Sequence, residues 1–155
     1  MTPSPTQGPS ALGIPRRADA THRVWAGLIS IGCLAVLVTA AVLRPDPTGM
    51  GTHQQLGLPP CSFKSVFDLP CPTCGMTTAF SNAAHLHPVA ALQCQPFGAL
   101  LALLAAVTFW VATHVACTGS SLGLTASRII TPRLPWLLVG GLLLGWGYTL
   151  LFARG

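Results

Sequence analysis

The sequence VWAGLISIGCLAVLVTAAVL, residues 24–43, decides the fold of this chain. It contains no charged side chain, and its length matches the ~20 residues that an α-helix needs to cross the ~30 Å hydrocarbon layer of a bilayer. A cleaved signal peptide would have a shorter apolar core, of roughly 7–15 residues, and a small-residue cleavage site. This run ends instead in Arg44-Pro45. The segment is therefore predicted to be a transmembrane helix that stays in the protein.

Two further apolar runs lie downstream, at residues 97–116 and 136–152. Both are rich in leucine and long enough to span a bilayer. Over the whole chain 51% of the residues are hydrophobic and only 7% are charged, against about 25% charged residues in a typical soluble domain. The predicted fold class is an all-α membrane protein with three transmembrane helices and the lipid bilayer as its partner.

The segments between the spans are predicted from their proline, glycine and polar content. Residues 1–22 are expected to form a disordered tail, because such a composition cannot bury a core. Residues 44–74 are expected to form a loop that carries cysteines. Residues 75–95 are expected to form a short interfacial or re-entrant helix, which Pro88 ends or restarts. Residues 117–134 are expected to form a short cytoplasmic link between the second and third spans.

The basic residues predict an orientation. Three lie on the side of the central loop, namely Arg44, Lys64 and Arg154. Five lie on the side of the N-terminus and the link, namely Arg16, Arg17, Arg23, Arg128 and Arg133. The positive-inside rule then places the N-terminus in the cytoplasm and the cysteine-bearing loop outside. These residues form no dense patch, so the net charge of +5 does not indicate a nucleic-acid partner.

The loop ends in Cys71-Pro72-Thr73-Cys74-Gly75, which concentrates the chemistry of the chain. Two thiols three positions apart can share a disulfide or bind one metal ion. Proline after the first cysteine fixes φ, and glycine after the second tolerates a positive φ, so the backbone can fold tightly around the sulfurs. A helix that follows directly would place Cys71 or Cys74 near its N-terminus. The dipole would then lower the pKa of that thiol from ~8.5 to ~7 or below.

Four cysteines share the predicted outer side, namely Cys61, Cys71, Cys74 and Cys94. One interpretation is thiol–disulfide exchange by Cys71 and Cys74 as catalytic residues, with a quinone as electron acceptor. A second is a zinc or iron site with all four thiolates as ligands and His85 or His87 as substitutes. The third is a structural disulfide, or buried thiols that shape the loop. The remaining thiols, Cys33 and Cys117, are expected to pack within or beside the helices, and His114 to be hydrogen-bonded near an interface.

Four segments together resemble a bacterial membrane family known as domain of unknown function 2752. They are Leu58–Cys61, Leu69–Phe80, Pro88–Ala91 and Gln95–Gly98, and the resemblance extends over roughly residues 55–152. By this resemblance the motif positions are Cys61, Cys71, Cys74, Gly75 and Thr77, with Cys94 associated. Thr78 stands where the family often has arginine, and Gln95 stands where it often has asparagine. The family implies a few membrane helices and no assigned activity.

Gly141 and Gly145 form a small-xxx-small pattern in the third span. Such glycines let helix backbones approach closely, either within this chain or in a homo-oligomer. The leading functional interpretation is an accessory or structural membrane module built around the CxxC motif, without enzymatic activity. The alternatives are a membrane thiol–disulfide oxidoreductase and a zinc- or iron-binding membrane module.

Overall fold

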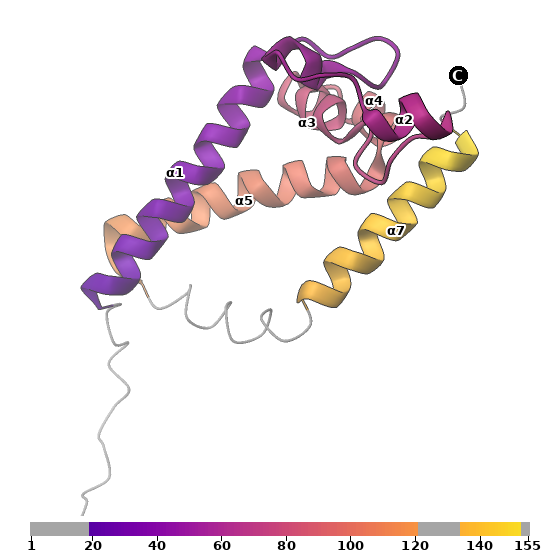
Figure 1. Cartoon of the computed structure of the whole chain (residues 1–155). Helices are drawn as coiled ribbons and strands as arrows, with labels where there is room; N and C mark the ends of the chain where they lie inside the picture. Colours follow the sequence, from indigo (N-terminus) through magenta and orange to yellow (C-terminus); the bar gives the residue numbers. More distant parts are fainter. Residues whose placement is uncertain (1–18, 121–133, 153–155) are drawn as a thin grey trace, which may run out of the picture.

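The computed structural model describes residues 19–120 and 134–152, and every regular element within these ranges is a helix (Figure 1). Three of the helices are long and apolar enough to cross a bilayer: α1 (Ala20–Val42), α5 (Pro96–Thr118) and α7 (Leu134–Phe152). The predicted fold class is therefore confirmed, and the three helices are compatible with a multi-pass membrane protein. Most of the predicted tail and most of the predicted link lie outside the described residues.

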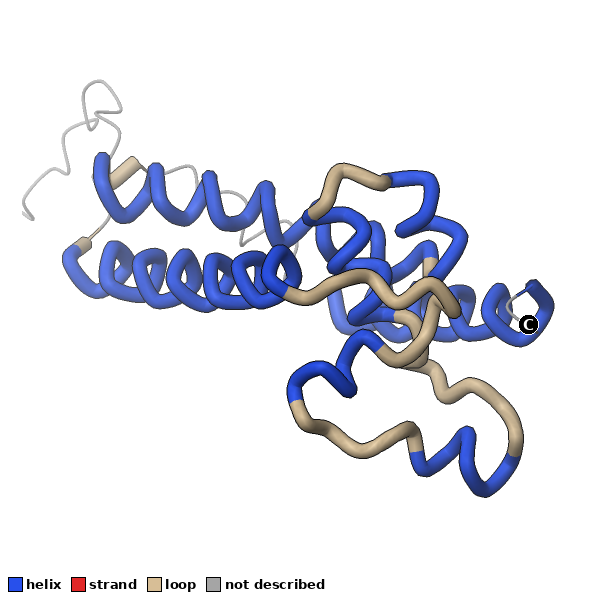
Figure 2. The backbone as a smooth tube through the Cα atoms, turned by 90° about the horizontal axis from the view of Figure 1, so that it is seen from above, coloured by secondary structure: helices blue, strands red, loops and turns tan. Residues whose placement is uncertain are grey.

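Helices α1 and α5 pack side by side in opposite directions (Figure 2). Near the middle of α1, Ser30 Oγ lies 2.7 Å from Thr113 Oγ1 of α5. The Arg23 side chain donates hydrogen bonds to the carbonyl oxygens of Ala116, at 3.0 Å, and Cys117, at 3.3 Å. Because the last carbonyl groups of a helix lack partners within the helix, Arg23 of α1 caps the C-terminal end of α5.

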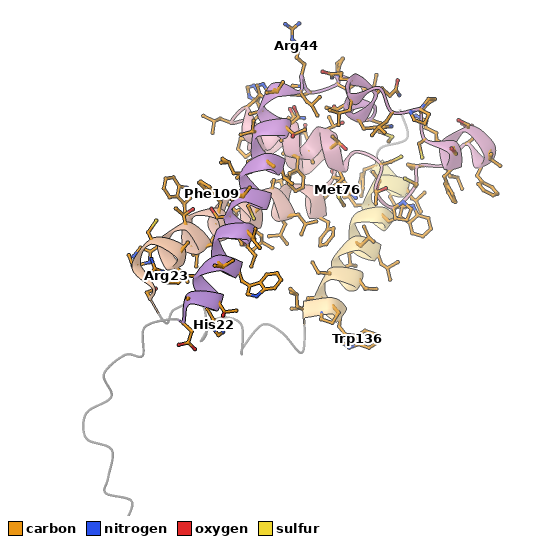
Figure 3. The ribbon with its side chains drawn as sticks, turned by 60° about the vertical axis from the view of Figure 1, so that its left-hand side comes forward. His22, Arg23, Arg44, Met76, Phe109 and Trp136 are labelled. Carbon is orange, nitrogen blue, oxygen red and sulfur yellow. The ribbon has the colours of Figure 1, made fainter. Side chains whose placement is uncertain are left out.

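The three long helices run alternately between two ends of the molecule. Figure 3 shows Arg23 and Trp136, which lie near the starts of α1 and α7, toward one end, and Arg44, just after α1, at the other. The short elements gather at the Arg44 end (Figure 1). They are η1 (Thr52–Leu56), α2 (Ser62–Phe67), α3 (Met76–Ala84) and α4 (Pro88–Cys94). This end, hereafter the cysteine-bearing end, holds the functional site.

The segment predicted as one interfacial helix, residues 75–95, consists of the two helices α3 and α4. The chain turns between them at Leu86, which has a positive φ of 61°. Pro88 then begins α4, where its fixed φ suits a first helical residue and its missing N–H costs nothing. The preceding segment, predicted as a loop, contains η1 and α2.

Buried polar contacts join α3 to the end of α1. The Ser81 hydroxyl donates a hydrogen bond to the carbonyl oxygen of Leu43, the residue after α1. Thr78 Oγ1 lies 2.9 Å from Thr52 Oγ1, and both threonines are fully buried. Buried polar groups are stable only when they are paired. These pairs fix α3 against α1 and η1, and thereby fix the start of α3, where the cysteine motif ends.

Helix α7 meets α5 at Phe97. A methyl group at Gly141 would collide with the Phe97 ring, and one at Gly145 would lie 2.9 Å from Phe97 Cβ. Gly140 and Gly147, on the same helix, have open space beside them. The two glycines of the small-xxx-small pattern therefore pack against Phe97 of the same chain. A homo-oligomer through Gly141 and Gly145 stays a prediction.

Candidate functional site

Three of the predicted cysteines converge at the cysteine-bearing end. The sulfur atoms of Cys61, Cys71 and Cys74 all lie within 4.8 Å of one another. Cys71 Sγ is 3.3 Å from Cys74 Sγ and 3.2 Å from Thr73 Oγ1. A disulfide bond measures about 2.05 Å, so these sulfurs are neighbouring thiols rather than a bonded pair. We call these three side chains the thiol cluster.

The backbone of the CxxC motif folds into a turn that brings its two sulfurs together. The Cys74 N–H donates to the Cys71 carbonyl oxygen at 2.9 Å, and the Met76 N–H donates to the Thr73 carbonyl oxygen at 3.1 Å. Gly75 has φ +84° and directly precedes α3. A Cβ at this position would lie 3.1 Å from the Cys94 carbonyl oxygen and 3.2 Å from that of Gly49. Both the backbone conformation and the available space therefore require glycine.

Two side chains from distant elements hold the carbonyl groups of the two prolines on either side of Cys71. Trp146 Nε1 of α7 donates to the Pro70 carbonyl oxygen at 2.9 Å. Gln95 Nε2 donates to the Pro72 carbonyl oxygen at 2.9 Å, and Gln95 is fully buried between α4 and α5. The position of Cys71 is thus set by contacts with the helices as well as by its own turn.

The third thiol, Cys61, comes from the residue before α2. Its thiolate accepts a hydrogen bond from the Lys64 backbone N–H, the largest influence, and this lowers its pKa to about 7 although partial burial acts in the opposite direction. The neighbouring Cys71 and Cys74 thiols lower the pKa of Cys61 further. At neutral pH a large share of Cys61 is therefore thiolate, the form that binds metals and attacks electrophiles.

The pKa of Cys74 is shifted in the direction opposite to that of Cys61. Burial raises its pKa to about 12, with a smaller contribution from the adjacent Cys71 thiol. The prediction of a pKa lowered by the following helix is therefore wrong for Cys74. Gly75, not a cysteine, is the residue that directly precedes α3, and the loss of hydration at the buried sulfur outweighs any favourable dipole. The prediction missed Cys61 as the ionised member of the cluster.

Cys94 lies apart from the thiol cluster. Its sulfur accepts a hydrogen bond from Asn82 Nδ2 at 3.7 Å, and burial raises its pKa. It borders a separate pocket of about 450 Å³, together with Asp46. Of the four thiols predicted as ligands of one metal ion, the structure therefore brings three together and places the fourth elsewhere.

The thiol cluster lines one edge of a pocket of about 980 Å³. One wall is a single face of α1, formed by Ala35, Val36, Thr39 and Ala40, and Leu43 just after the helix continues it. The opposite wall is the start of α3, including Thr77 of the predicted motif. His53, Lys64 and Asp68 provide polar groups at the rim of the pocket. The site thus joins an apolar wall within a predicted membrane span to a sulfur-rich edge.

The predicted histidines do not join the thiol cluster. His85 Nδ1 lies 2.8 Å from the Ser81 carbonyl oxygen, within its own helical turn. His87 is exposed and immediately precedes α4. His114 Nδ1 is 3.4 Å from Thr118 Oγ1 near the end of α5. His85 and His114 thus have polar contacts within their own helical turns, as expected for satisfied histidines.

The sequence interpretation missed several residues that shape the site. Met50, in the loop after α1, and His53, in η1, line the pocket from a segment without any motif. Trp146 reaches Pro70 across 76 positions of sequence. No spacing pattern connects such residues. Gln95 and Thr78, noted only as departures from the family, are both fully buried structural contacts of this end.

Residues 61–109 match a family model described as "Protein of unknown function (DUF2752)". The match supports the resemblance predicted from the cysteine motif, over a shorter segment than the predicted 55–152. No curated protein and no solved structure matches the chain. The family description assigns no activity, so the function has to be argued from the site.

Proposed function

We propose that this chain is an accessory membrane module whose thiol cluster binds one thiophilic metal ion, with zinc or iron as the reference ions. The observation that carries the proposal is the convergence of three sulfur atoms, from two segments of the loop, within 4.8 Å of one another. In a tetrahedral zinc site with Zn–S bonds of about 2.3 Å, the sulfurs lie roughly 3.8 Å apart. The spacing of the thiol cluster needs only small shifts to meet this geometry.

The rigidity of the CxxC turn also supports the proposal. The carbonyl groups of the prolines on either side of Cys71 are held by Trp146 and Gln95, so two of the three ligands are positioned before an ion arrives. Preorganised ligands lose little conformational entropy on binding. Three protein ligands leave one position of a tetrahedral ion for a further ligand, and the adjoining pocket has room for it.

The orientation of the module belongs to the same proposal. The N-terminus lies in the cytoplasm and the cysteine-bearing end outside, because more basic residues flank the N-terminal side. A glycosylation or thiol-reactive tag between residues 44 and 60 tests this orientation in intact cells. Labelling by an impermeant reagent is expected. Labelling only after the membrane is opened would reverse the orientation.

Metal analysis of the purified, reduced protein in detergent tests the proposal. We expect one zinc or iron ion per chain, and a loss of at least about tenfold in affinity for Cys61→Ser. This variant should fold, because α2 contains no buried residue. The matched control is Cys117→Ser, since Cys117 is exposed at the far end of α5. A folded wild-type protein that binds no ion, or equal binding by Cys61→Ser, would contradict the proposal.

A second candidate function, thiol–disulfide exchange, is favoured by the 3.3 Å separation of Cys71 Sγ and Cys74 Sγ. One thiolate would attack a partner's disulfide and release a partner thiolate, and the other would then displace the second, leaving Cys71–Cys74 oxidised and the partner reduced. Reoxidation would require an electron acceptor such as a quinone. Alkylation of freshly quenched membranes, with and without reductant, separates the two functions. Exchange predicts a fraction of Cys71 and Cys74 that reacts only after reduction, whereas the metal site predicts reduced thiols released by a chelator.

A further inference from the structure

The pocket beside the thiol cluster collects most of the sulfur in the described part of the chain. Five of the eight cysteine and methionine side chains that the structure describes line it, namely Met50, Cys61, Cys71, Cys74 and Met76. The other three, Cys33, Cys94 and Cys117, lie elsewhere. Sulfur atoms are soft metal ligands. The cavity therefore offers two soft ligands, the methionine thioethers, in addition to the three thiols.

The two methionines come from different segments. Met50 lies in the loop after α1, and Met76 is the first residue of α3, two positions after Cys74. Both side chains are half-buried and border the cavity, whereas a methionine that fills a core would be fully buried. In Figure 3, Met76 lies between Arg44 and the opposite end of the molecule, where Arg23 and Trp136 lie. The two thioether side chains thus line the same cavity as the thiol cluster.

The donor set distinguishes between metal ions. A structural zinc site has four ligands drawn from cysteine, histidine and carboxylates, and does not use thioethers. Within residues 19–120 and 134–152, no fourth cysteine, histidine, aspartate or glutamate joins the thiol cluster. Monovalent copper is softer, accepts two or three sulfur ligands, and binds both thiolates and thioethers.

We propose that the ion selected by this site is monovalent copper, bound by the thiol cluster and delivered to it through Met50 and Met76. This inference rests on the proposed function, because it names the ion of the same site. Thioethers are neutral and bind Cu(I) without releasing a proton, which suits transient binding along an entry path. The thiols bind more tightly, because each becomes a thiolate when it coordinates the ion. The cavity therefore provides a path from weaker to stronger sulfur donors.

The test compares Cu(I) and Zn(II) binding to the full chain in detergent, without oxygen and with a colorimetric Cu(I) chelator as competitor. The wild-type protein is expected to take Cu(I) from the chelator and to prefer it over Zn(II). Met50→Leu combined with Met76→Leu keeps the side-chain size and removes both thioethers. We expect this variant to acquire Cu(I) about tenfold more slowly, with Zn(II) binding unchanged. The matched control is Phe80→Leu, which alters the same pocket without removing sulfur.

The outcomes separate this inference from the proposed function. If the chain binds Zn(II) in preference to Cu(I), and the double methionine variant takes up both ions as fast as the wild type, the copper inference is overturned and the metal site stands. If Phe80→Leu slows Cu(I) uptake as much as the double variant does, pocket shape rather than sulfur accounts for the effect, and the delivery role is overturned. If the folded protein binds neither ion, both proposals fail.

Discussion

The two sides of the thiol cluster differ in how the protein holds them. On one side, Cys71 and Cys74 lie in a turn that precedes α3, whose buried residues include Thr78 and Ser81. On the other side, Cys61 precedes α2, which contains no buried residue and whose main internal contact is between Phe63 and Phe67, with ring centroids 4.8 Å apart. One side is fixed by the fold, and the other reaches the cluster from an exposed segment.

This difference indicates how the site works. The fixed side supplies preorganised ligands but keeps Cys74 protonated, because burial raises its pKa. The exposed side supplies a thiol that ionises near neutral pH, because the Lys64 backbone N–H stabilises its thiolate. Of the three thiols in the cluster, Cys61 can therefore bind the ion first, and the ion then displaces the proton of the buried Cys74 thiol.

The largest expected difference between Cys61 and Cys74 is in the rate at which their thiols are alkylated. In the reduced, metal-free protein, alkylation of Cys61 should rise with pH to half its maximum at about pH 7, because the thiolate is the reactive form. Cys74 should stay unmodified at that pH, because burial raises the pKa of its thiol to about 12 and keeps it protonated. Peptide mass spectrometry after timed alkylation measures both. The denatured protein is the control, and equal rates for the two thiols in the folded protein would remove the distinction.

Glycine-to-alanine substitutions on the two sides of the thiol cluster should lower the free energy of unfolding by different amounts. Gly75→Ala places a methyl group against two carbonyl oxygens at a positive φ, and should lower the free energy of unfolding by about 3 kcal/mol. Gly57→Ala, in the segment that leads to α2, has a similar φ of +76° but open space around the added methyl group. It should cost only about 1 kcal/mol. Chemical denaturation in detergent measures both values, and equal losses would show that the close approach at Gly75 is unimportant.

The smallest expected effect on stability is that of substituting Trp146, whose indole holds the CxxC turn through Pro70. Trp146→Phe removes the hydrogen bond to Pro70 and should cost about 1 kcal/mol of stability, together with a several-fold loss of metal affinity. Trp136→Phe is the matched control on the same helix, because Trp136 is 79% exposed. The same denaturation and metal titrations apply to both variants. Unchanged affinity in Trp146→Phe would mean that the turn positions Cys71 without help from α7.

Much of the fold is readable from composition, because a span needs only length and apolarity. The charge-free run at residues 24–43 and the two later runs each overlap one long helix. The turn at the CxxC motif also follows from local chemistry, since proline and glycine restrict the backbone there. Pro88 marked the break between α3 and α4 for the same reason.

The composition of the site depends on contacts that no local pattern contains. Cys61 and Cys94 were equivalent in sequence, as single cysteines of the outer region. The fold separates them, because the end of α4 places Cys94 beside Asn82 while α2 turns Cys61 toward the motif. Trp146 and Pro70 are likewise joined only by tertiary structure. The small-xxx-small spacing of Gly141 and Gly145 is compatible with a contact to a second chain and with a contact to Phe97. Only the tertiary structure shows the contact to Phe97.

X-ray absorption spectroscopy of the metal-loaded protein tests the central claim most directly, since it reports the donor atoms around the ion. We predict a shell of three sulfur atoms at about 2.3 Å in the wild-type protein and two in Cys61→Ser. Cys94→Ser should keep all three, because Cys94 lies outside the cluster. A shell made of nitrogen and oxygen, or loss of a sulfur in Cys94→Ser but not in Cys61→Ser, would contradict the account.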